Sequence, residues 1–575
     1  MTRRFYLPEK VEITLEDSTL WYRVPYRYRE LIKKLPGAKY HAKREQWHTP
    51  LTWAALVQAR GIFDDRLDTA VEVGEWAWNE YTSRVLAAET SREVALNPDS
   101  VGILGDPRMR NYQRTGVDFL VTAQSAVLAD DRGLGKTFIA LQTVEQLDAF
   151  PILVVSPKTA KVTSWADEIE KWYPGRSFTV VDSTGSRKLK QLSADTDITV
   201  VNFETLLTGR IARYGSIRLS DKDREDGPLN RDWGTIVVDE GHRVKDPHAK
   251  QTRALWAVGE RAKHRYVLTG TPIANNLSDF WSILRFISPD EWPSKTAFVD
   301  RYCEVTFGYN GSMVISGLKK DNKEEFFRIV DCRLLRRTKE LVAPDLPPKV
   351  HQVLFVDMTP KQKAAYNEMK KTQVAQLESG EIVASFNPMT LKMRLGRFAK
   401  AYCAVDDNGK IVMSMPSSTV DAVVELANET TPLVVFSAAK QLLNLADTEL
   451  QAKGFTTARI TGDESDKQRK DSLLRFNTNK AQVILCTLGA GSESIDLSHA
   501  SVLVFMMRNY SAVANPQAED RIHRLSQTAD HVVIIDIITP GTVDEEIVPK
   551  LEAKYEIAED LLRDKETLER YAPDK

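Results

Sequence analysis

A glycine-rich segment around residue 133 has the residue types and spacing of a phosphate-binding loop. The segment ADDRGLGKT covers residues 129–137, follows a short apolar run and precedes the helical pattern TFIALQTVEQL. Gly133 and Gly135 let the backbone curl so that its N–H groups face a phosphate, and the N-terminus of the following helix favours the same anion. Lys136 is placed to reach the β- and γ-phosphates, and the Thr137 hydroxyl to bind Mg²⁺. The segment therefore predicts a site for ATP and Mg²⁺.

Two other interpretations of this loop exist. A dinucleotide-binding fingerprint, GxGxxG, would need glycine at the position of Phe138 and is excluded. A glycine turn followed by a surface lysine stays open on this motif alone. The residues predicted to bind the nucleotide here are Asp130, Asp131, Arg132, Gly133, Leu134, Gly135, Lys136 and Thr137.

A second acidic motif, VVDEGH at residues 237–242, ends another apolar run about a hundred residues further along the chain. Asp239 is placed to hold Mg²⁺, and Glu240 to orient and deprotonate the attacking water. The tetrapeptide DEGH alone is compatible with a solvated turn. Together with the glycine-rich loop it is more specific, because phosphoryl transfer needs both a metal-bridged phosphate and a positioned nucleophile.

Two arginines further along have the spacing of a helical face. In NPQAEDRIHRLSQ (515–527), Gln517, Arg521 and Arg524 fall at i, i+4 and i+7, so a helix would present all three on one side. Arginines in such a position stabilise the charge that develops on a γ-phosphate. A basic stripe on the surface is the alternative for an isolated arginine pair.

Short apolar runs that alternate with helical patterns must position these residues. Each run is about five residues long, apolar on both faces and followed by a turn, which is typical of a buried parallel sheet with helices on both faces. The first series comprises residues 126–130, 152–156, 198–202, 235–240 and 266–270, and the second comprises residues 432–437, 457–461, 483–487, 502–507 and 532–538. The proline-rich LVAPDLPPK (341–349) between them predicts a linker. We therefore expect two consecutive α/β lobes.

The composition excludes several classes of protein. The 575 residues carry 78 Lys and Arg against 80 Asp and Glu, and 42% are hydrophobic, as in globular chains with more than one core. No apolar run approaches the ~18 residues of a membrane span, and the first residues lack the apolar stretch of a signal peptide. With four cysteines and no CxxC pair, neither a disulfide scaffold nor a zinc site is expected. We expect a cytoplasmic protein without membrane contact.

Charge is unevenly spread along the chain. The total of −2 by itself argues mildly against nucleic acid, but residues 1–50 carry a net charge of +5 and residues 64–106 one of −7. In WYRVPYRYRE (21–30), arginines alternate with aromatic residues, as in surfaces that bind phosphates and stack bases. A strand with one buried aromatic face and solvated arginines explains the same pattern and is favoured on the pattern alone.

The order of the motifs resembles the Swi/Snf family of DNA translocases, a branch of the superfamily-two helicase-like ATPases. The resemblance runs from about Met109 to Leu562. Besides the motifs above, it is carried by MRNYQRTGVDFL (109–120), LVVSPKTAKVTSWADEIEKW (153–172), VVNFETL (200–206), LTGTPIANNLSDFWSILRFISP (268–289), LLRRTKELVAPDLPPK (334–349) and ITGDESDKQRKDSLLRFN (460–477). It implies two RecA-like lobes that close around ATP and Mg²⁺ while duplex DNA lies across both.

The resemblance also implies roles for individual residues. Gln113 takes the adenine-reading position, Gln517 joins the nucleotide site, and Arg521 and Arg524 act as arginine fingers. The residues expected to couple phosphate release to lobe movement are His242, Thr269, Gly270 and Thr271. The residues expected to contact the DNA backbone are Ser156, Lys158, Asn202, Ser437 and Thr487.

Three positions depart from the family pattern. Arg132 stands where a methionine is usual, Ser492, Glu493 and Ser494 stand where glycines are common, and Ser526 replaces a glycine after the arginine pair. None of these changes removes a catalytic group. They bear on how closely the backbone near residues 491–495 approaches DNA or nucleotide.

The first hundred residues resemble a different module. Residues 18–59, with an aromatic strand, a helix, the sequence LPGAKY and a following strand, are similar to the HARP-type domain that precedes the motor in annealing helicases. This resemblance makes Arg23, Arg27, Lys33 and Lys39 candidates for binding branched or forked DNA. A packing domain without DNA contacts is the alternative.

The sequence thus predicts an α/β protein with two tandem RecA-like lobes and a small N-terminal α+β domain, divided at residues 1–95, 96–345 and 346–575. We expect a monomeric, DNA-dependent ATPase that moves on duplex or branched DNA, in replication or repair, in a bacterial cell or a phage-infected host. A strand-separating helicase on DNA or RNA is one alternative. A nucleotide-gated DNA clamp without turnover is another.

Overall fold

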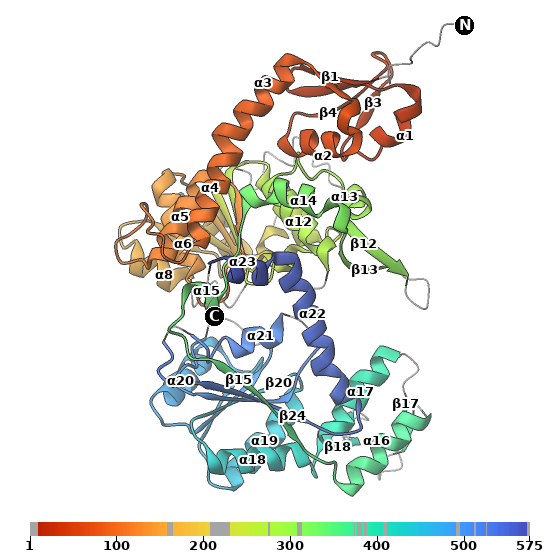
Figure 1. Ribbon diagram of the computed structural model, residues 1–575. Coiled ribbons are helices and arrows are strands. Elements are labelled where there is room, and N and C mark those ends of the chain that lie inside the picture. Colours follow the sequence, from red (N-terminus) through yellow and green to blue (C-terminus); the bar gives the residue numbers. More distant parts are fainter. Residues whose placement is uncertain are drawn as a thin grey trace, which may run out of the picture. The chain divides into compact units, whose positions relative to one another are not determined.

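The chain divides into two compact units. The computed structural model describes residues 10–157, 165–207, 231–273, 276–307, 313–372, 374–376, 382–384, 388–405, 411–489, 495–510, 513–524 and 526–571 (Figure 1). Unit 1 comprises Met1–Val342 with Ile557–Lys575, and unit 2 comprises Ala343–Glu556. The first passage between the units falls inside the predicted linker at 341–349. The second passage differs from the expected division, because residues 557–575 group with unit 1 and not with the lobe expected at 346–575.

The N-terminal part of unit 1 is a small α+β domain, as predicted. Its sheet has the strand order β3-β4-β2-β1-β5, mixed in direction, with β1 and β5 parallel and the other neighbours antiparallel. The strands are β1 (Val11–Glu16), β2 (Thr19–Arg23), β3 (Lys39–His41), β4 (Gln46–Pro50) and β5 (Leu67–Thr69). Val11, Ile13, Leu20 and Tyr22 form its core with α2 (Trp53–Phe63). Short helix α1 (Arg29–Ile32) completes the domain before α3 (Val71–Glu80).

Two helices join this domain to the large sheet of unit 1. Ala54 and Val57 of α2 lie in the core on one face of that sheet. On the other face, α4 (Leu86–Leu96), which follows α3 through a π-helical turn, contributes Ala88 and Leu96 to the core. The sequence places Ala54, Val57 and Ala88 in an accessory domain that ends at residue 95, whereas their side chains pack with the lobe expected at 96–345.

The large sheet of unit 1 has seven parallel strands within the described residues, in the order β14-β6-β11-β10-β7-β9-β8. The strands are β6 (Ala126–Leu128), β7 (Ile152–Ser156), β8 (Phe178–Val180), β9 (Ile198–Asn202), β10 (Trp233–Asp239), β11 (Ala262–Leu268) and β14 (Leu334–Leu335). All five predicted runs of the first series are strands. The two edge strands, β14 and β8, are additional, because runs of two or three residues are too short to show a periodicity.

Helices cover both faces of this sheet, as the apolar runs predict (Figure 1). Val127 and Val238 point into one core and Leu128 and Val237 into the other, which is the alternation of a strand buried on both faces. On one side pack α5 (Asn111–Ala123), α6 (Lys136–Leu147), α8 (Ala166–Trp172) and α4, and on the other α11 (Lys250–Gly259), α12 (Leu277–Ile287), α13 (Lys295–Tyr302), α14 (Lys323–Val330) and α2. Also in unit 1 are α9 (Gly185–Leu192), α15 (Lys339–Val342), α23 (Asp564–Tyr571) and the hairpin of β12 (Cys303–Phe307) and β13 (Met313–Leu318).

Unit 2 repeats this architecture with a second parallel sheet, whose described strands have the order β15-β24-β23-β20-β22-β21. The strands are β15 (Lys349–Phe355), β20 (Leu433–Ser437), β21 (Thr457–Ile460), β22 (Val483–Thr487), β23 (Val502–Met507) and β24 (Val532–Ile538). All five predicted runs are present, and β15 is additional because it directly follows the proline-rich segment. Its helices are α16 (Pro360–Thr372), α17 (Pro388–Lys400), α18 (Ser418–Glu429), α19 (Lys440–Ala452), α20 (Asp466–Asn477) and α21 (Ala514–Glu519), and the hairpins are β16 (Val374–Gln376) with β17 (Ile382–Ala384) and β18 (Tyr402–Val405) with β19 (Ile411–Ser414). The fold class is confirmed, and α22 (Ile547–Leu562) leads the chain back to unit 1.

Over the part of the chain that the structure describes, no helix combines the length and apolar character needed to cross a membrane.

The position of α4 predicts a difference between two apolar residues of the same helical stretch. Leu96 is 2% exposed and Trp78 is 67% exposed. Leu96→Ala should lower the free energy of unfolding of unit 1 by about 2–5 kcal/mol, the usual cost of removing a buried leucine side chain. Trp78→Ala should change it by less than about 0.5 kcal/mol. Urea unfolding followed by circular dichroism measures both, and equal effects of the two substitutions would contradict the packing of α4 on the sheet.

Candidate functional site

Three neighbouring strands of unit 1 bring the predicted nucleotide-binding segments together. Strands β6, β11 and β10 are adjacent and parallel, so their carboxyl ends meet at one edge of the sheet. The glycine-rich loop follows β6, Thr269–Thr271 follow β11, and Asp239 ends β10. This edge is where open α/β sheets bind ligands.

The glycine-rich loop needs glycine for two separate reasons. Gly133 and Gly135 have φ angles of +85° and +81°, which residues with a side chain rarely adopt. A β-carbon on Gly135 would also lie 2.3 Å from Nε2 of Gln113, which donates to the carbonyl of Leu134 at 3.2 Å. Helix α6 then begins at Lys136, so the free N–H groups of its first turn face the loop. The predicted adenine-reading residue Gln113 is therefore in contact with the loop.

Lys136 and Thr137 occupy the first turn of α6. The Lys136 ammonium donates to the carbonyl oxygens of Asp130 at 2.7 Å and Asp131 at 3.0 Å, so it lies over the mouth of the loop. Burial lowers the pKa of Lys136, and the negative charges of Glu240 and Asp130 oppose that shift. The Lys136 amino group therefore interacts with both the loop and the acidic motif.

The acidic motif contains two carboxylates with different environments. Asp239 accepts hydrogen bonds from the Trp165 indole at 2.9 Å and from the backbone N–H of Glu240 at 2.9 Å. Burial and the neighbouring charge of Glu240 raise the pKa of Asp239 to about 6. Burial would also raise the pKa of Glu240, but the His242 imidazole at 3.2 Å and the cations of Arg132 and Lys136 lower it instead. Glu240 is thus the more acidic carboxyl group of the pair.

The backbone at Glu240 is strained. Its φ of +51° and ψ of +54° are left-handed, which is uncommon for a residue other than glycine, asparagine or aspartate. The strand ends at Asp239, and this conformation turns the chain sharply into the 3₁₀ helix that carries His242. The strained residue is the one that the sequence predicts as the base.

The donor set at this edge fits a magnesium ion. Thr137 supplies a hydroxyl and Asp239 a carboxylate, which are the hard oxygen ligands that Mg²⁺ prefers. A cation beside Asp239 would also relieve the desolvation that raises the pKa of that carboxyl group. Within the described residues, no cluster of three or more His, Cys, Asp or Glu side chains forms an all-protein metal site, and Mg²⁺ in phosphoryl-transfer sites is commonly held by one or two carboxylates together with the phosphates.

Arg132, the departure from the family pattern, connects two of the three segments. Its guanidinium donates to the Thr271 hydroxyl at 3.2 Å, and its side chain packs on Gly270, where a β-carbon would lie 2.9 Å from its Cγ. The glycine-rich loop and the Thr269–Thr271 segment are therefore linked directly. Thr269 is buried, and its hydroxyl accepts from the Thr271 N–H at 3.1 Å.

Arginines 336 and 337, to which the sequence assigns no site role, hold the two aspartates of the loop. Arg337 and Asp130 are both fully buried and form a two-point ion pair, with Nε–Oδ1 at 3.0 Å and Nη2–Oδ2 at 2.5 Å. Arg336 binds Asp131 at 2.6 Å. The carboxylates predicted to face the nucleotide therefore face these arginines. Trp165 is a third residue that sequence reasoning missed, and in all three cases the partner lies far away in the chain.

The predicted DNA contacts lie at the carboxyl ends of adjacent strands in each unit. Ser156 ends β7 and pairs in register with Asn202 at the end of β9. In unit 2, Ser437 ends β20 and pairs with Thr487 at the end of β22. The hydroxyls of the buried Ser156 and Ser437 bond to local backbone, and Asn202 accepts from the Thr205 N–H at 2.8 Å. Lys158 lies outside the described residues, as do the substituted positions 492–494.

The arginine pair of unit 2 does not lie on one helix. Helix α21 ends at Glu519, and the chain continues in turns through Arg521 and Arg524, so the prediction of one helical face with Gln517 is wrong. The helix is short because Asp520 and the following residues turn back, with the Arg521 carbonyl accepting from the Leu497 N–H at 3.0 Å. Gln517 and Arg521 are buried, and Arg524 is half-buried with its Nε donating to the Asp520 carbonyl at 3.3 Å.

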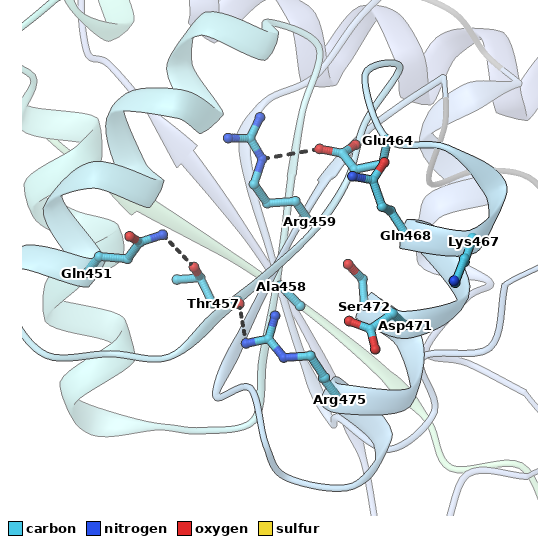
Figure 2. Close-up of a pocket in the computed structure, with 10 residues that line it drawn as sticks. All are labelled: Gln451, Thr457, Ala458, Arg459, Glu464, Lys467, Gln468, Asp471, Ser472 and Arg475. Atoms are coloured by element: carbon cyan, nitrogen blue, oxygen red, sulfur yellow. Dashed lines mark hydrogen bonds and ion pairs between the residues drawn. The ribbon is translucent and has the colours of Figure 1, made fainter.

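A separate cavity of about 520 Å³ lies in unit 2 beside edge strand β21 (Figure 2). Its charged and polar residues come from β21, α19, α20 and the loop before α20. Figure 2 shows two of their pairs, which are Arg459 with Glu464, at 3.4 Å, and Gln451 with Thr457, at 3.0 Å. Arg475 donates to the Thr457 carbonyl at 3.2 Å. Its lining contains none of the residues predicted to bind nucleotide.

The N-terminal domain places aromatic and basic side chains on one face of its sheet. Trp21, Lys39 and His48 occupy directly paired positions on β2, β3 and β4, and exposed Arg23 follows two residues after Trp21. Tyr22 points the opposite way and is fully buried, so part of the pattern is strand alternation. The Arg44 guanidinium lies 4.3 Å from the Trp21 ring centroid. Of the other two candidates, Arg27 lies in a 3₁₀ turn and Lys33 follows α1 and pairs with Glu30 at 2.5 Å.

Comparison with protein families gives two matches. The SNF2-related domain matches residues 112–404, about half of the chain, and the helicase conserved C-terminal domain matches residues 418–526. These two matches cover the glycine-rich loop, the acidic motif and the arginine pair. Neither covers the N-terminal domain, so its resemblance to HARP-type domains stays a prediction.

Several proteins are similar to most of the chain. The ISWI chromatin-remodeling complex ATPase ISW1 of Saccharomyces cerevisiae is 25% identical over 483 residues, which are 78% of this chain and 40% of that protein. Protein CHROMATIN REMODELING 5 of Arabidopsis thaliana is 27% identical over 545 residues, 87% of this chain and 30% of that protein. The chain spans less than half the length of these relatives. Among solved structures, the Sulfolobus solfataricus SWI2/SNF2 ATPase core in complex with dsDNA is 23% identical with a TM-score of 0.37, over 81% of this chain and 95% of that one.

The buried ion pair under the loop predicts a large and specific effect on stability. Arg337→Met leaves the Asp130 carboxylate buried without its cation, which should lower the free energy of unfolding by about 3–5 kcal/mol. The double variant Asp130→Leu with Arg337→Met removes both charges and should recover most of that loss. Urea unfolding measures both variants. A single substitution that costs less than about 1 kcal/mol would contradict the assigned pairing.

Proposed function

The chain belongs to the SNF2-related domain family, and from this premise we propose that it is a DNA-dependent ATPase that moves along duplex DNA. One observation carries the proposal. Adjacent parallel strands bring the Lys136 ammonium, the Asp239 carboxylate and the ionised Glu240 to the same edge of one sheet. These are the groups that hydrolysis of a nucleoside triphosphate requires.

The division of work among these residues follows from their environments. The N–H groups of the loop and of the first turn of α6 would bind the phosphates, and Lys136 would exchange its carbonyl partners for phosphate oxygens. Glu240, which is ionised, would orient water for in-line attack on the γ-phosphorus and accept its proton. Thr137 and Asp239 would hold Mg²⁺, which supplies charge neutralisation when it is bound. Arg521 and Arg524 of unit 2 are proposed to stabilise the charge that develops on the phosphate.

Contact with DNA is proposed for the strand ends next to the nucleotide site. In the unit 1 sheet, β7 lies beside β10 and β9 lies beside β7, so Ser156 and then Asn202 follow the acidic motif along the same edge. Ser437 and Thr487 have the corresponding position in unit 2. Backbone N–H groups at these ends suit phosphate contacts, which do not depend on base sequence. Cycles of ATP binding and release would then shift the two units along one strand, with His242 and Thr269–Thr271 as coupling segments.

The finer parts of the proposal rest on the N-terminal domain and on resemblance. We propose that the aromatic and basic sheet face of the N-terminal domain binds branched or forked DNA, so that the activity is annealing or fork remodelling in replication or repair. The proposed setting is the cytoplasm of a bacterial cell or a phage-infected host. The named relatives are chromatin-remodelling proteins of eukaryotes, and the chain covers less than half of their length. A strand-separating helicase and a clamp without turnover are the competing functions.

The ATPase proposal predicts a loss of turnover from one substitution. Lys136→Ala should lower kcat for ATP hydrolysis at least about 100-fold, because it removes the cation that stabilises the transferring phosphoryl group. Lys250→Ala, which changes an exposed lysine at the start of α11, serves as the matched control and should leave kcat unchanged. Phosphate release measured with no nucleic acid, single strand, duplex, forked DNA and RNA gives the readout.

The same measurements separate the competing functions. Stimulation by duplex or forked DNA supports the translocase. A rate of ATP hydrolysis that is the same with and without nucleic acid would contradict the translocase proposal. A higher rate with single-stranded RNA would favour the strand-separating helicase. Nucleotide binding without hydrolysis in the unaltered protein would favour the clamp.

The N-terminal sheet face predicts a change in binding to forked DNA. Replacing Arg23 and Lys39 by glutamine should weaken forked-DNA binding about ten-fold and reduce the slope of log K against log salt by about 2, because two phosphate contacts are lost. Arg29→Gln with Lys34→Gln, two exposed positions at α1 outside this face, removes the same charge and should have a smaller effect. Fluorescence anisotropy over a salt series measures both. Equal losses for the two double variants would show that only net charge matters and would rule out this face.

A further inference from the structure

A strained turn at Arg563 holds the C-terminal segment against α14 and the residues that follow it in unit 1. Arg563, between α22 and α23, has a φ of +58°, which is uncommon for arginine. Its guanidinium lies 3.7 Å from the centroid of the Phe327 ring and forms an ion pair with Asp331. Two interactions of the side chain thus fix a backbone conformation that the residue would otherwise disfavour.

This turn presents the next residue, Asp564, to Arg336. The carboxylate is 6% exposed and receives Nε of Arg336 at 3.1 Å and Nη2 at 2.9 Å, a two-point pair that fixes the plane of the guanidinium. Helix α23, which begins at Asp564, packs on α15, and the two lie together in Figure 1. Asp564 is not part of any motif that the sequence singled out.

Arg336 carries the connection on to the nucleotide loop. Its remaining nitrogen, Nη1, binds the Asp131 carboxylate at 2.6 Å and donates to the Ala129 carbonyl at 2.8 Å. Burial alone would lower the pKa of Arg336, and the two carboxylates reverse that and raise it, so the guanidinium stays charged. The other oxygen of Asp131 accepts from the Lys339 N–H at 3.0 Å. Asp131 is therefore held on both oxygens, and its carbonyl is one of the two that receive Lys136.

The position of this cluster in the chain is also informative. The chain passes between the units twice, after Val342 and after Glu556. Arg336 lies six residues before the first passage, and Asp564 lies eight residues after the second. The ion pair Arg336–Asp564 therefore ties together, inside unit 1, the two chain segments that lead to unit 2.

We propose that Asp564 is a positioning residue for the nucleotide loop, which acts through Arg336 on Asp131 and Ala129. The proposal rests on the proposed function, because it assumes that the loop binds ATP. It adds that the C-terminal segment sets the affinity of the loop for nucleotide. The segment does so without contributing a group to the site itself. Loss of the Asp564 charge leaves a buried guanidinium with one carboxylate, free to turn away from the loop.

Binding of a non-hydrolysable ATP analogue with Mg²⁺ to the full chain tests this without turnover. Asp564→Asn, which keeps the shape and removes the charge, should raise the Kd for the analogue about ten-fold. In steady-state hydrolysis, KM should rise by a similar factor while kcat changes less than about two-fold. Glu566→Gln is the matched control on the same helix, since Glu566 pairs with the exposed Lys323 at 3.0 Å and does not contact the loop, and it should leave Kd unchanged.

A double-mutant cycle distinguishes positioning from general stabilisation. Asp131→Asn combined with Asp564→Asn should be no worse than Asp131→Asn alone, because both act through Arg336. The proposal would be overturned if the double variant raised Kd by the product of the two single effects, or if Asp564→Asn alone had the Kd of the unaltered protein. If Asp564→Asn melts too early for binding to be measured, Asp564→Glu decides: a folded protein with raised Kd supports the proposal, and a folded protein with wild-type Kd overturns it. If the unaltered protein binds no analogue, the proposed function fails. If Lys136→Ala abolishes binding but Asp564→Asn binds as the unaltered protein does, the proposed function stands and only this inference is refuted.

Discussion

The nucleotide loop depends on a pair of ionic contacts beneath it. The loop begins with two aspartates, Asp130 and Asp131, whose side chains are paired with arginines. Arg337 neutralises Asp130 in a fully buried pair, and Arg336 neutralises Asp131. Arg337 also donates to the Tyr112 carbonyl and, at 3.3 Å, to the Thr115 hydroxyl, so the same guanidinium holds the helix that carries Gln113. Helix α5, the loop and the segment before the linker are thus connected through Arg337.

A second organising constraint is the order of strands along one sheet edge. Parallel strands place all their carboxyl ends together, and the order β6-β11-β10-β7-β9 puts the phosphate, coupling and acidic segments next to each other and the candidate DNA contacts immediately beyond. Asp239, at the end of β10, lies where the candidate nucleotide-binding segments adjoin the candidate DNA contacts of β7 and β9. Trp165, which lies between the β7 and β8 strands in the chain, donates to that aspartate and so connects the segment after β7 to the candidate magnesium ligand. The sheet topology therefore places the candidate DNA contacts next to the candidate nucleotide site.

The two carboxylates of the acidic motif illustrate how environment separates similar groups. They are adjacent in the chain, yet Asp239 is raised to a pKa of about 6 by burial and by its neighbour, while the cations around Glu240 keep that residue ionised. The two neighbours therefore titrate in different pH ranges, with Asp239 the weaker acid and Glu240 the stronger one. The left-handed backbone at Glu240 is the local cost of placing two acids at the end of one strand and pointing them differently.

The sequence by itself determined the parallel α/β lobes and all ten predicted strands, and it named the residues of the candidate nucleotide site. It could do so because those signals are local: apolar runs of about five residues, glycines at a tight turn, and acids at a strand end. Tertiary structure alone decided that Asp130 and Asp131 face arginines about two hundred residues away, that α21 stops before Arg521, that α4 packs with the motor sheet, and that Asp564 returns to the loop. Each of these is a contact between distant segments. No periodicity within one segment records which charge or apolar face it will meet, because the partner is chosen by the packing of the whole sheet.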